Sequence, residues 1–397
     1  MPHRISKGQV IAFRLGAHCL TERLAEDGLP RAAGRCGIQN SPPGSALLAL
    51  HARVGNFRQD QLASAVAEEK SLLQSWCMRG SPFYFPTSDA AVFTTGVLPP
   101  TEEAMRHLVS GVEPALDKLG MSFTKAVELT GAEIGDVLSG RRLAINELGA
   151  EIATRIARRL PQRQRGIWQE NGPYAPGQPF GEGIVHFCIR ILTLQRVVCF
   201  APRTGNKAPL VLVNEWLGHP IPDVAPDLAR AELLRRYLRC YGPSTRGGFA
   251  AWTGVHPGDT GPWWSLIEDE MTQVDFAGLP SWILTEDLDA LLSAPMPKGV
   301  RLLPPHDPYT QIHDRNTIVD EKYHREVWKA AGGPGTVLTR GKLAGTWRPR
   351  LRGPKLTIAV KTFGALGDQD IKSLKDEAGQ VAALRGAPAV EVEFEAY

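Results

Sequence analysis

The chain has 397 residues, 43% of them hydrophobic and 22% charged, an ordinary composition for a soluble globular protein and a length sufficient for two or three domains. It has no stretch of about 18 uncharged apolar residues, and Arg14 interrupts the apolar run after the basic N-terminus. We therefore expect no membrane span, no signal peptide and a cytoplasmic location. The net charge of +3 by itself neither indicates nor excludes nucleic-acid binding.

The first third of the chain is predicted to be helical. Leucine and valine recur at helical spacing in residues 47–54 and again in residues 62–73, between the breaks at Pro42-Pro43 and Pro99-Pro100. Thr101 precedes two glutamates, a pattern typical of an N-cap that opens another helix.

The next segment is predicted to be a helix-turn-helix unit with a trailing hairpin. Residues 145–160 and 183–194 show helical periodicity, and residues 195–213 contain two β-rich runs. Gly205-Asn206 at the tip is a hairpin turn signal, so this hairpin resembles a wing.

A second unit of the same kind is predicted further on. Residues 227–240 form a strongly basic helix, Gly242-Pro243 ends it, and Ser244 or Thr245 caps a helix that runs to about Trp252. A plain helical hairpin in a bundle would carry the same signals, and this alternative stays open.

The last third, from Val300, is predicted to be β-rich. Residues 336–360 contain three strand-like runs separated by short basic turns. Asp307 and Arg315 are predicted to form a buried ion pair, and Arg53 is predicted to be a salt-bridge or helix-face residue. There is no self-similarity at 20 to 50 residues, so a solenoid is not expected.

No metal or cofactor is expected. The six cysteines lack the close spacing typical of zinc sites, and they do not indicate a disulfide framework. His306 and His313 resemble a metal pair but lack a second close set of ligands. A GxSxG elbow and a P-loop are also absent from the sequence.

Basic residues cluster in residues 155–165, 230–246 and 340–361, where they indicate phosphate contacts or, alternatively, solvated helix faces. Two basic turns are candidates for contact with DNA, and an ordinary surface hairpin is the alternative for each. The second turn is favoured because its central leucine suits a wedge. The candidate side chains are Arg203 and Lys207 in the first turn and Arg348, Arg350, Leu351, Arg352 and Lys355 in the second.

The segment Gln39-Asn40-Ser41 precedes a helix rich in alanine and leucine that ends near Arg53, and Arg79-Gly80 follows. This pattern resembles the AlkZ-like winged-helix DNA glycosylases, in which a Gln-aliphatic-Gln or Gln-aliphatic-Asp motif leads into such a helix. Gln39 matches the first Gln, whereas Asn40 and Ser41 depart from the motif. The likeness covers nearly the whole chain, through residues 234–243, 249–252, 303–307, 314–315 and 345–348.

The resemblance implies an α+β fold with tandem winged-helix motifs and a β-rich C-terminal part. We expect a helical N-terminal region with the Gln39 motif in residues 1–135, a tandem winged-helix region in 136–299 and a β-rich domain in 300–397. It also implies a monomer that acts on double-stranded DNA carrying an alkylated purine, without contact with a membrane.

An alkylated purine carries positive charge and leaves readily, so its removal needs mainly a held water and stabilisation of the sugar cation. In this interpretation Gln39 orients the water, Asn40 or Ser41 supplies a second hydrogen bond, and Arg79 contacts a phosphate or braces the loop. A capped turn is the alternative for this segment.

The resulting hypothesis is a monofunctional DNA glycosylase for alkylated purines, above all bulky N7-alkylguanine adducts of a genotoxic antibiotic, acting in self-resistance. The alternative is a winged-helix protein without catalysis that binds DNA or sequesters the drug, which Ser41 favours.

Overall fold

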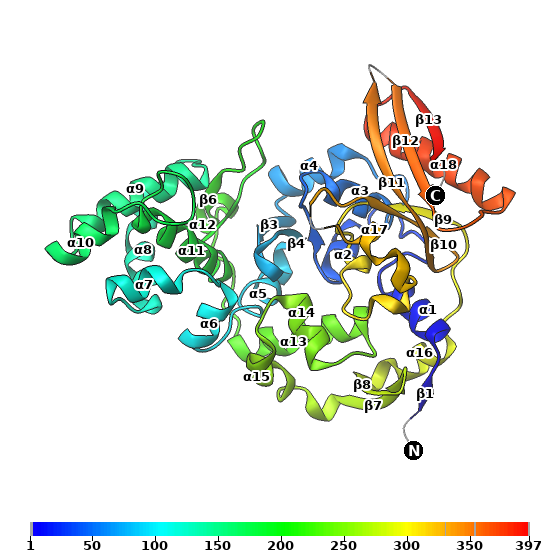
Figure 1. The fold of residues 1–397 in the computed structure, drawn as a ribbon, viewed down its shortest axis with the longest axis horizontal. Helices are drawn as coiled ribbons and strands as arrows, with labels where there is room; N and C mark the ends of the chain where they lie inside the picture. The colour runs from blue at the N-terminus through cyan, green and yellow to red at the C-terminus, as the bar shows by residue number, and fades with distance from the viewer. Residues whose placement is uncertain (1–2, 330, 353–354, 396–397) are drawn as a thin grey trace.

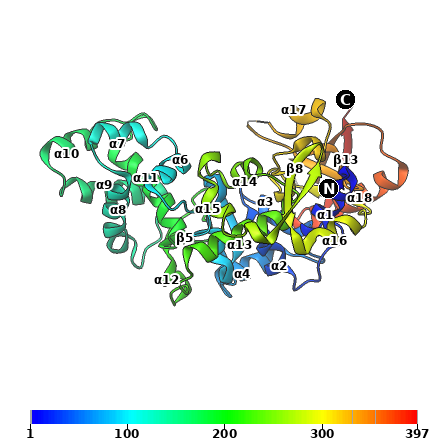
Figure 2. The ribbon, with the colours of Figure 1, turned by 90° about the horizontal axis from the view of Figure 1, so that it is seen from below.

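The computed structural model describes residues 3–329, 331–352 and 355–395, with only the backbone for residues 351 and 352. Figures 1 and 2 show a helical lobe beside a larger body, and the body holds both the N- and the C-terminal end. In the described part of the chain, every helix is too short or too polar to cross a membrane.

The lobe has a core of its own, to which α8, α9 and α11 contribute their apolar faces. The N-cap predicted at Thr101 is confirmed, because its hydroxyl accepts a hydrogen bond of 3.2 Å from the backbone N–H of Ala104. The helices of the lobe are α6 (Glu102–Leu108), α7 (Glu113–Leu119), α8 (Phe123–Leu138), α9 (Ile145–Ala157), α10 (Gln162–Gln169) and α11 (Phe180–Leu194).

The helices expected in the first unit are found, together with one further helix. The helices expected in residues 145–160 and 183–194 are α9 and α11, but α10 lies between them in the chain. The predicted hairpin is also confirmed, since β5 (Val198–Phe200) pairs antiparallel with β6 (Leu210–Leu212). Thr204 and Lys207 exchange backbone hydrogen bonds of 3.0 and 3.1 Å at its tip.

The central sheet joins the N-terminal third to this hairpin. Its strand order is β2-β4-β3-β5-β6, and its pairs are antiparallel. The helical spacing expected up to Leu73 is wrong at its end, because Leu72 and Leu73 begin a strand whose first four residues are buried. Both faces of that strand are covered, so its apolar residues do not alternate with polar ones and resemble a buried helix. The elements of this region are α1 (Lys7–Ala17), α2 (Leu29–Gly34), β2 (Ile38–Gln39), α3 (Ser45–His51), α4 (Gln59–Ala67), β3 (Leu72–Trp76), β4 (Pro82–Pro86) and α5 (Ala90–Phe93).

The two helices expected in the second unit are also found. Gly242 ends the basic helix, and the Thr245 hydroxyl caps the next helix by accepting a bond of 3.1 Å from the backbone N–H of Gly248. A hairpin follows, and β1 (Arg4–Ile5) adds to it in parallel, which brings the N-terminus to this unit. The elements are α13 (Pro226–Tyr241), α14 (Arg246–Thr253), α15 (Gly261–Trp264), β7 (Met271–Phe276), β8 (Leu279–Leu284) and α16 (Leu288–Ser293), while α12 (Val213–Leu217) follows β6 and packs against it.

The predicted β-rich last third is confirmed. Its sheet has the order β13-β12-β11-β10-β9, in which β12 and β13 are parallel and the other pairs antiparallel. The β11–β12 hairpin extends from the body, at the upper right of Figure 1. The elements are β9 (Val300–Leu303), α17 (His324–Val327), β10 (Gly335–Thr339), β11 (Lys342–Arg352), β12 (Lys355–Thr362), α18 (Asp368–Leu384) and β13 (Ala389–Glu395).

One buried ion pair connects the first and last thirds of the chain. Both guanidinium nitrogens Nη1 and Nη2 of Arg53 lie 2.8 Å from the Asp307 carboxylate, and the side chains are 2% and 0% exposed. The salt bridge predicted for Arg53 is therefore confirmed. The predicted partner of Asp307 was wrong: Arg53 occupies the position beside Asp307, and Arg315 packs on Trp328 instead.

We expect the free energy of unfolding to depend on pH through the buried imidazole of His51. His51 ends α3, is 6% exposed, and its Nδ1 atom has no hydrogen-bond partner. Burial lowers the pKa of His51 to about 4, whereas an unfolded histidine has a pKa of about 6.5. The neutral ring therefore makes its full contribution to the free energy of unfolding above about pH 6.5. This contribution is lost as the pH falls toward 4, by roughly 1.4 kcal/mol per pH unit.

Urea unfolding of wild type and His51→Gln at about pH 7 and pH 5 measures this contribution. Between the two pH values, wild type should lose about 2 kcal/mol more than the variant, because glutamine does not titrate. Equal losses would contradict the assignment to His51.

Candidate functional site

Gln39 lies at the end of β2, where its pairing with Phe83 of β4 fixes the backbone. The side chain is 6% exposed, and its Oε1 atom accepts a hydrogen bond of 3.0 Å from Nη2 of Arg79. Because a guanidinium only donates, this bond fixes the orientation of the amide with its oxygen toward Arg79. The structure thus brings together two residues that are 40 positions apart in the chain.

Asn40 and Ser41 lie in the loop that leads from β2 to α3. The Oδ1 atom of Asn40 accepts hydrogen bonds of 2.9 Å from the backbone N–H of Gly44 and 3.4 Å from that of Ala46. The Asn40 oxygen therefore holds the start of α3, as the capped-turn alternative expects. Ser41 is partly exposed, and its hydroxyl makes no hydrogen bond to any other residue in the described ranges.

Arg79 is held in an unusual conformation. Its φ of 55° lies in the left-handed region that non-glycine residues rarely adopt. Its guanidinium bonds the carbonyl of Trp252 as well as Gln39, and burial lowers the pKa of Arg79. A Cβ atom at Gly254 would lie 2.9 Å from the Cα atom of Arg79, so the end of α14 approaches here only because that residue is glycine. Strained residues of this kind concentrate at functional sites.

A cavity of about 1090 Å³ opens beside Arg79. Among the residues that the structure describes, the only carboxylate in its lining is that of Asp314, which accepts hydrogen bonds from Arg14 at 2.8 and 3.1 Å. Gln39 is not part of this lining and lies behind Arg79. The lining holds more positively charged side chains than carboxylates, and its one carboxylate is already paired with Arg14, so the cavity suits an anionic ligand. They are Arg4, Lys7, Arg79 and Arg315.

The wing-like hairpin presents its predicted side chains at the surface. Arg203 and Lys207 are both exposed. Arg203 donates to the carbonyl of Asn206 at 2.5 Å, and the Lys207 ammonium lies 2.7 Å from the Glu147 carboxylate. Such exposed pairs are weak, so both side chains remain accessible for contact with a phosphate.

The β11–β12 hairpin carries carboxylates next to its cations. Arg350 lies 2.8 Å from Glu395, and Lys355 lies 2.6 Å from Glu391 of β13. These pairs offset part of the positive charge expected there. Arg348 is exposed and donates to the carbonyl of Gly332. The side chains of Leu351 and Arg352 and the turn at 353–354 lie outside the described residues.

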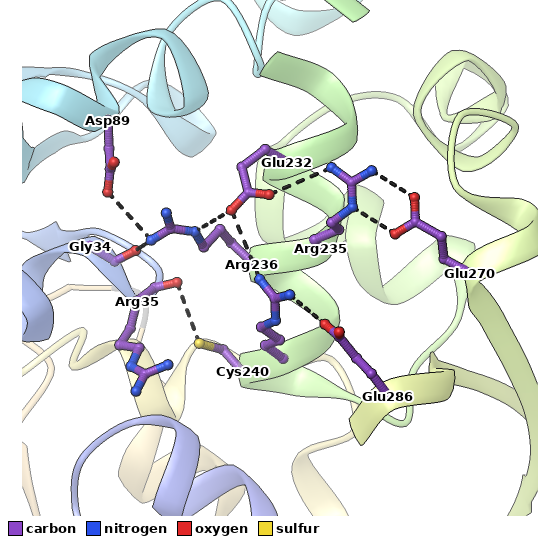
Figure 3. A network of polar contacts seen from close by, with 10 residues as sticks. Gly34, Arg35, Asp89, Glu232, Arg235, Arg236, Cys240, Glu270 and Glu286 are labelled. Atoms are coloured by element: carbon purple, nitrogen blue, oxygen red, sulfur yellow. Dashed lines mark hydrogen bonds and ion pairs between the residues drawn. The ribbon is translucent and has the colours of Figure 1, made fainter. Parts of the chain in front are cut away.

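The basic face of α13 is engaged within the protein. Figure 3 shows its arginines directed at carboxylates of the same helix and of neighbouring elements. Arg235 lies 2.6 Å from Glu270, and Arg236 lies 2.7 Å from Glu232. Arg239 forms a third pair, with Glu286. These three residues thus form ion pairs within the protein, and the phosphate contacts of this cluster stay a prediction.

The fold gathers potential metal ligands that are far apart in the sequence. His18, Cys36 and Cys240 are buried, with their ligand atoms within 4.8 Å of one another. His107, His256 and Asp259 form a second, more exposed group. His306 and His313, the pair considered from the sequence, belong to neither group within the described residues.

Sequence reasoning assigned no role to several residues of the cavity wall. Arg4 and Lys7 reach the cavity because β1 pairs with β7, and Trp328 reaches it from the segment after β9. No spacing in the chain indicates this assembly. The only local signal was the Asp314-Arg315 pair, as part of the family pattern.

Comparisons with known proteins agree on one family. The family model for DNA glycosylase AlkZ-like proteins matches residues 33–384. An interstrand DNA cross-link repair glycosylase of Streptomyces sahachiroi is 25% identical over 394 residues, which cover 97% of this chain and 98% of that protein. The solved structure of Streptomyces sahachiroi DNA glycosylase AlkZ has the same fold, with a TM-score of 0.75 and 24% identity over 99% of this chain and 100% of that one. The chain therefore belongs to the AlkZ-like DNA glycosylases, enzymes that hydrolyse N-glycosyl bonds.

Proposed function

We propose that this glycosylase removes alkylated purines from double-stranded DNA, above all bulky N7-alkylguanine adducts of a genotoxic antibiotic, and thereby gives self-resistance. The observation that carries the proposal is the cavity of about 1090 Å³ beside Arg79, whose guanidinium donates a hydrogen bond to Gln39. Pockets of about 300–1,000 Å³ hold drug-sized ligands, so a base with a large substituent fits this volume. The similar cross-link repair glycosylase supports an adduct of this kind.

In the proposed reaction, the water oxygen attacks C1′ while the N9–C1′ bond breaks. The bonding electrons neutralise the alkylated base, which leaves without prior protonation, and the water releases a proton to solvent. Gln39 orients the water through its remaining lone pair or its amide N–H, since Arg79 uses one lone pair of Oε1. Ser41 supplies a second hydrogen bond, directly or through a bridging water, and Asn40 contributes through Nδ2 because its oxygen holds α3.

DNA is proposed to lie across two winged-helix motifs, one built from α9, α11 and the β5–β6 hairpin, the other from α13, α14 and the β7–β8 hairpin. The cationic cavity wall supports this placement. Contacts with phosphates and grooves are assigned to two hairpins. The residues are Arg203 and Lys207 in the first and Arg348, Arg350, Leu351, Arg352 and Lys355 in the second. We propose that the protein acts as a monomer in the cytoplasm.

A base-release assay tests the proposal. Purified protein is expected to release the modified base from duplexes carrying one N7-alkylguanine and to leave an abasic site that alkali cleaves, without cutting the strand itself. Undamaged duplex of the same sequence is the control. If the protein binds the damaged duplex but releases no base, the monofunctional enzyme is excluded for that adduct, and the alternative of DNA binding or drug sequestration takes its place.

A further inference from the structure

One wall of the cavity, formed by residues far from Arg79 in the sequence, carries the aromatic side chain of Trp328, which is held in place by a hydrogen bond. Trp328 is partly buried, lines the cavity, and donates from Nε1 to the carbonyl of Thr310 at 3.0 Å. Thr310 is 4% exposed, and its hydroxyl donates to the carbonyl of Asp307 at 2.8 Å. The indole is thus anchored to the same buried segment that pairs with Arg53, which fixes its ring before any ligand binds.

Two neighbours define the surroundings of this ring. His324 packs edge-on, with ring centroids 5.2 Å apart and an interplanar angle of 86°. The guanidinium of Arg315 lies over the indole, 4.6 Å from the ring centroid. A guanidinium between an aromatic ring and a cavity offers its outer side to a second flat group.

Arg315 is suited to such a contact. The residue is exposed, lines the cavity, and has no ion-pair partner in the described parts of the chain. Because its guanidinium stacks on Trp328 and forms no ion pair with a described carboxylate, its positive charge is not neutralised by a partner. A planar aromatic group that stacks here would therefore be stabilised by a cation–π contact with Arg315 and by the removal of its apolar surface from water.

We propose that the Arg315–Trp328 pair binds a planar aromatic group carried by the alkylated base, and so makes the enzyme select aromatic adducts over small alkyl lesions. Arg79 and Arg315 line the same cavity, so a base near Arg79 directs its substituent along the wall toward Arg315. The inference rests on the proposed function, in which this cavity receives the adduct.

Binding to two matched lesions tests the inference. Duplexes of one sequence carry a single N7-guanine adduct of either aniline mustard, which adds a phenyl ring, or methyl mustard, which does not. A 2′-fluoroarabino sugar at the lesion slows loss of the base, so that equilibrium affinity is measured without turnover. Wild type is expected to bind the phenyl adduct at least about tenfold more tightly than the methyl adduct, since stacking of one ring typically gives a preference of this size.

Substitutions at the pair should remove that preference selectively. Trp328→Ala and Arg315→Ala should bring the two affinities within about twofold of each other. Arg315→Lys keeps the charge without the plane and should also lose most of the preference. Trp328→Phe should keep part of it. Arg325→Ala, at an exposed arginine outside the cavity lining, is the matched control and should behave as wild type.

The other possible results either contradict the inference or show whether it fails independently of the proposed function. Equal binding of both adducts by wild type would overturn it. So would equal weakening of both adducts and undamaged duplex by Arg315→Ala with rescue by Arg315→Lys, which identifies a phosphate contact. Base release is measured in parallel on the ordinary deoxyribose duplexes. A phenyl preference that depends on Trp328, without release of either base, would uphold this inference while rejecting the proposed function.

Discussion

Replacing Asp307 by Ala is expected to lower the free energy of unfolding by about 3–5 kcal/mol. The change leaves the Arg53 guanidinium, whose side chain is 2% exposed, buried without its carboxylate. It also removes the acceptor of the Tyr309 backbone N–H at 2.9 Å. The loss is so large because the remaining charge cannot reach water, and it is measured by urea unfolding at neutral pH.

Matched variants separate burial from charge in this prediction. Glu395→Ala breaks the exposed pair with Arg350 and should cost less than about 1 kcal/mol. The double variant Arg53→Met with Asp307→Leu removes both charges and should recover much of the loss. A cost below about 1 kcal/mol for Asp307→Ala would contradict the role given to the buried pair.

The second large effect is expected at Gln39. If its amide positions the attacking water, Gln39→Ala should reduce the single-turnover rate of base release at least about tenfold, which corresponds to about 1.4 kcal/mol in the transition state. DNA affinity should change little, because the side chain is 6% exposed. Gln74→Leu, at a buried glutamine of the same sheet, is the control, and its rate should stay near that of wild type.

Arg79 extends this prediction, since it donates to the Gln39 oxygen. Arg79→Met should lower the single-turnover rate by a factor similar to Gln39→Ala, and the double variant should lose little more than either single variant because the two act through one hydrogen bond. If Arg79→Met instead weakens DNA binding and reduces its salt slope by about 0.9, Arg79 is a phosphate contact. Unchanged rates in both single variants would remove the pair from the mechanism.

Local chemistry in the sequence was sufficient for several elements. The cap at Thr101, the cap at Thr245 and the hairpin around Gly205-Asn206 are set by side chains within a few residues of one another. The turn between β10 and β11 is equally local. The order of short motifs along the chain also indicated the family that the comparisons establish. The roles of Gln39, Asn40 and Ser41 stay predictions.

Tertiary structure alone decided the contacts between distant segments. Asp307 lies 254 residues from Arg53 but only 8 from Arg315, and yet its partner in the fold is the distant Arg53. Leu72 and Leu73 belong to a strand because β3 pairs with β4 and β5 inside the central sheet, and the two leucines are buried in two different hydrophobic clusters. Arg79 met Gln39, and Arg4 joined Trp328 in one cavity wall, through strand pairings that no local spacing specifies. Burial and pairing are properties of the whole fold, and therefore the sequence pattern identified the candidate residues but not their partners.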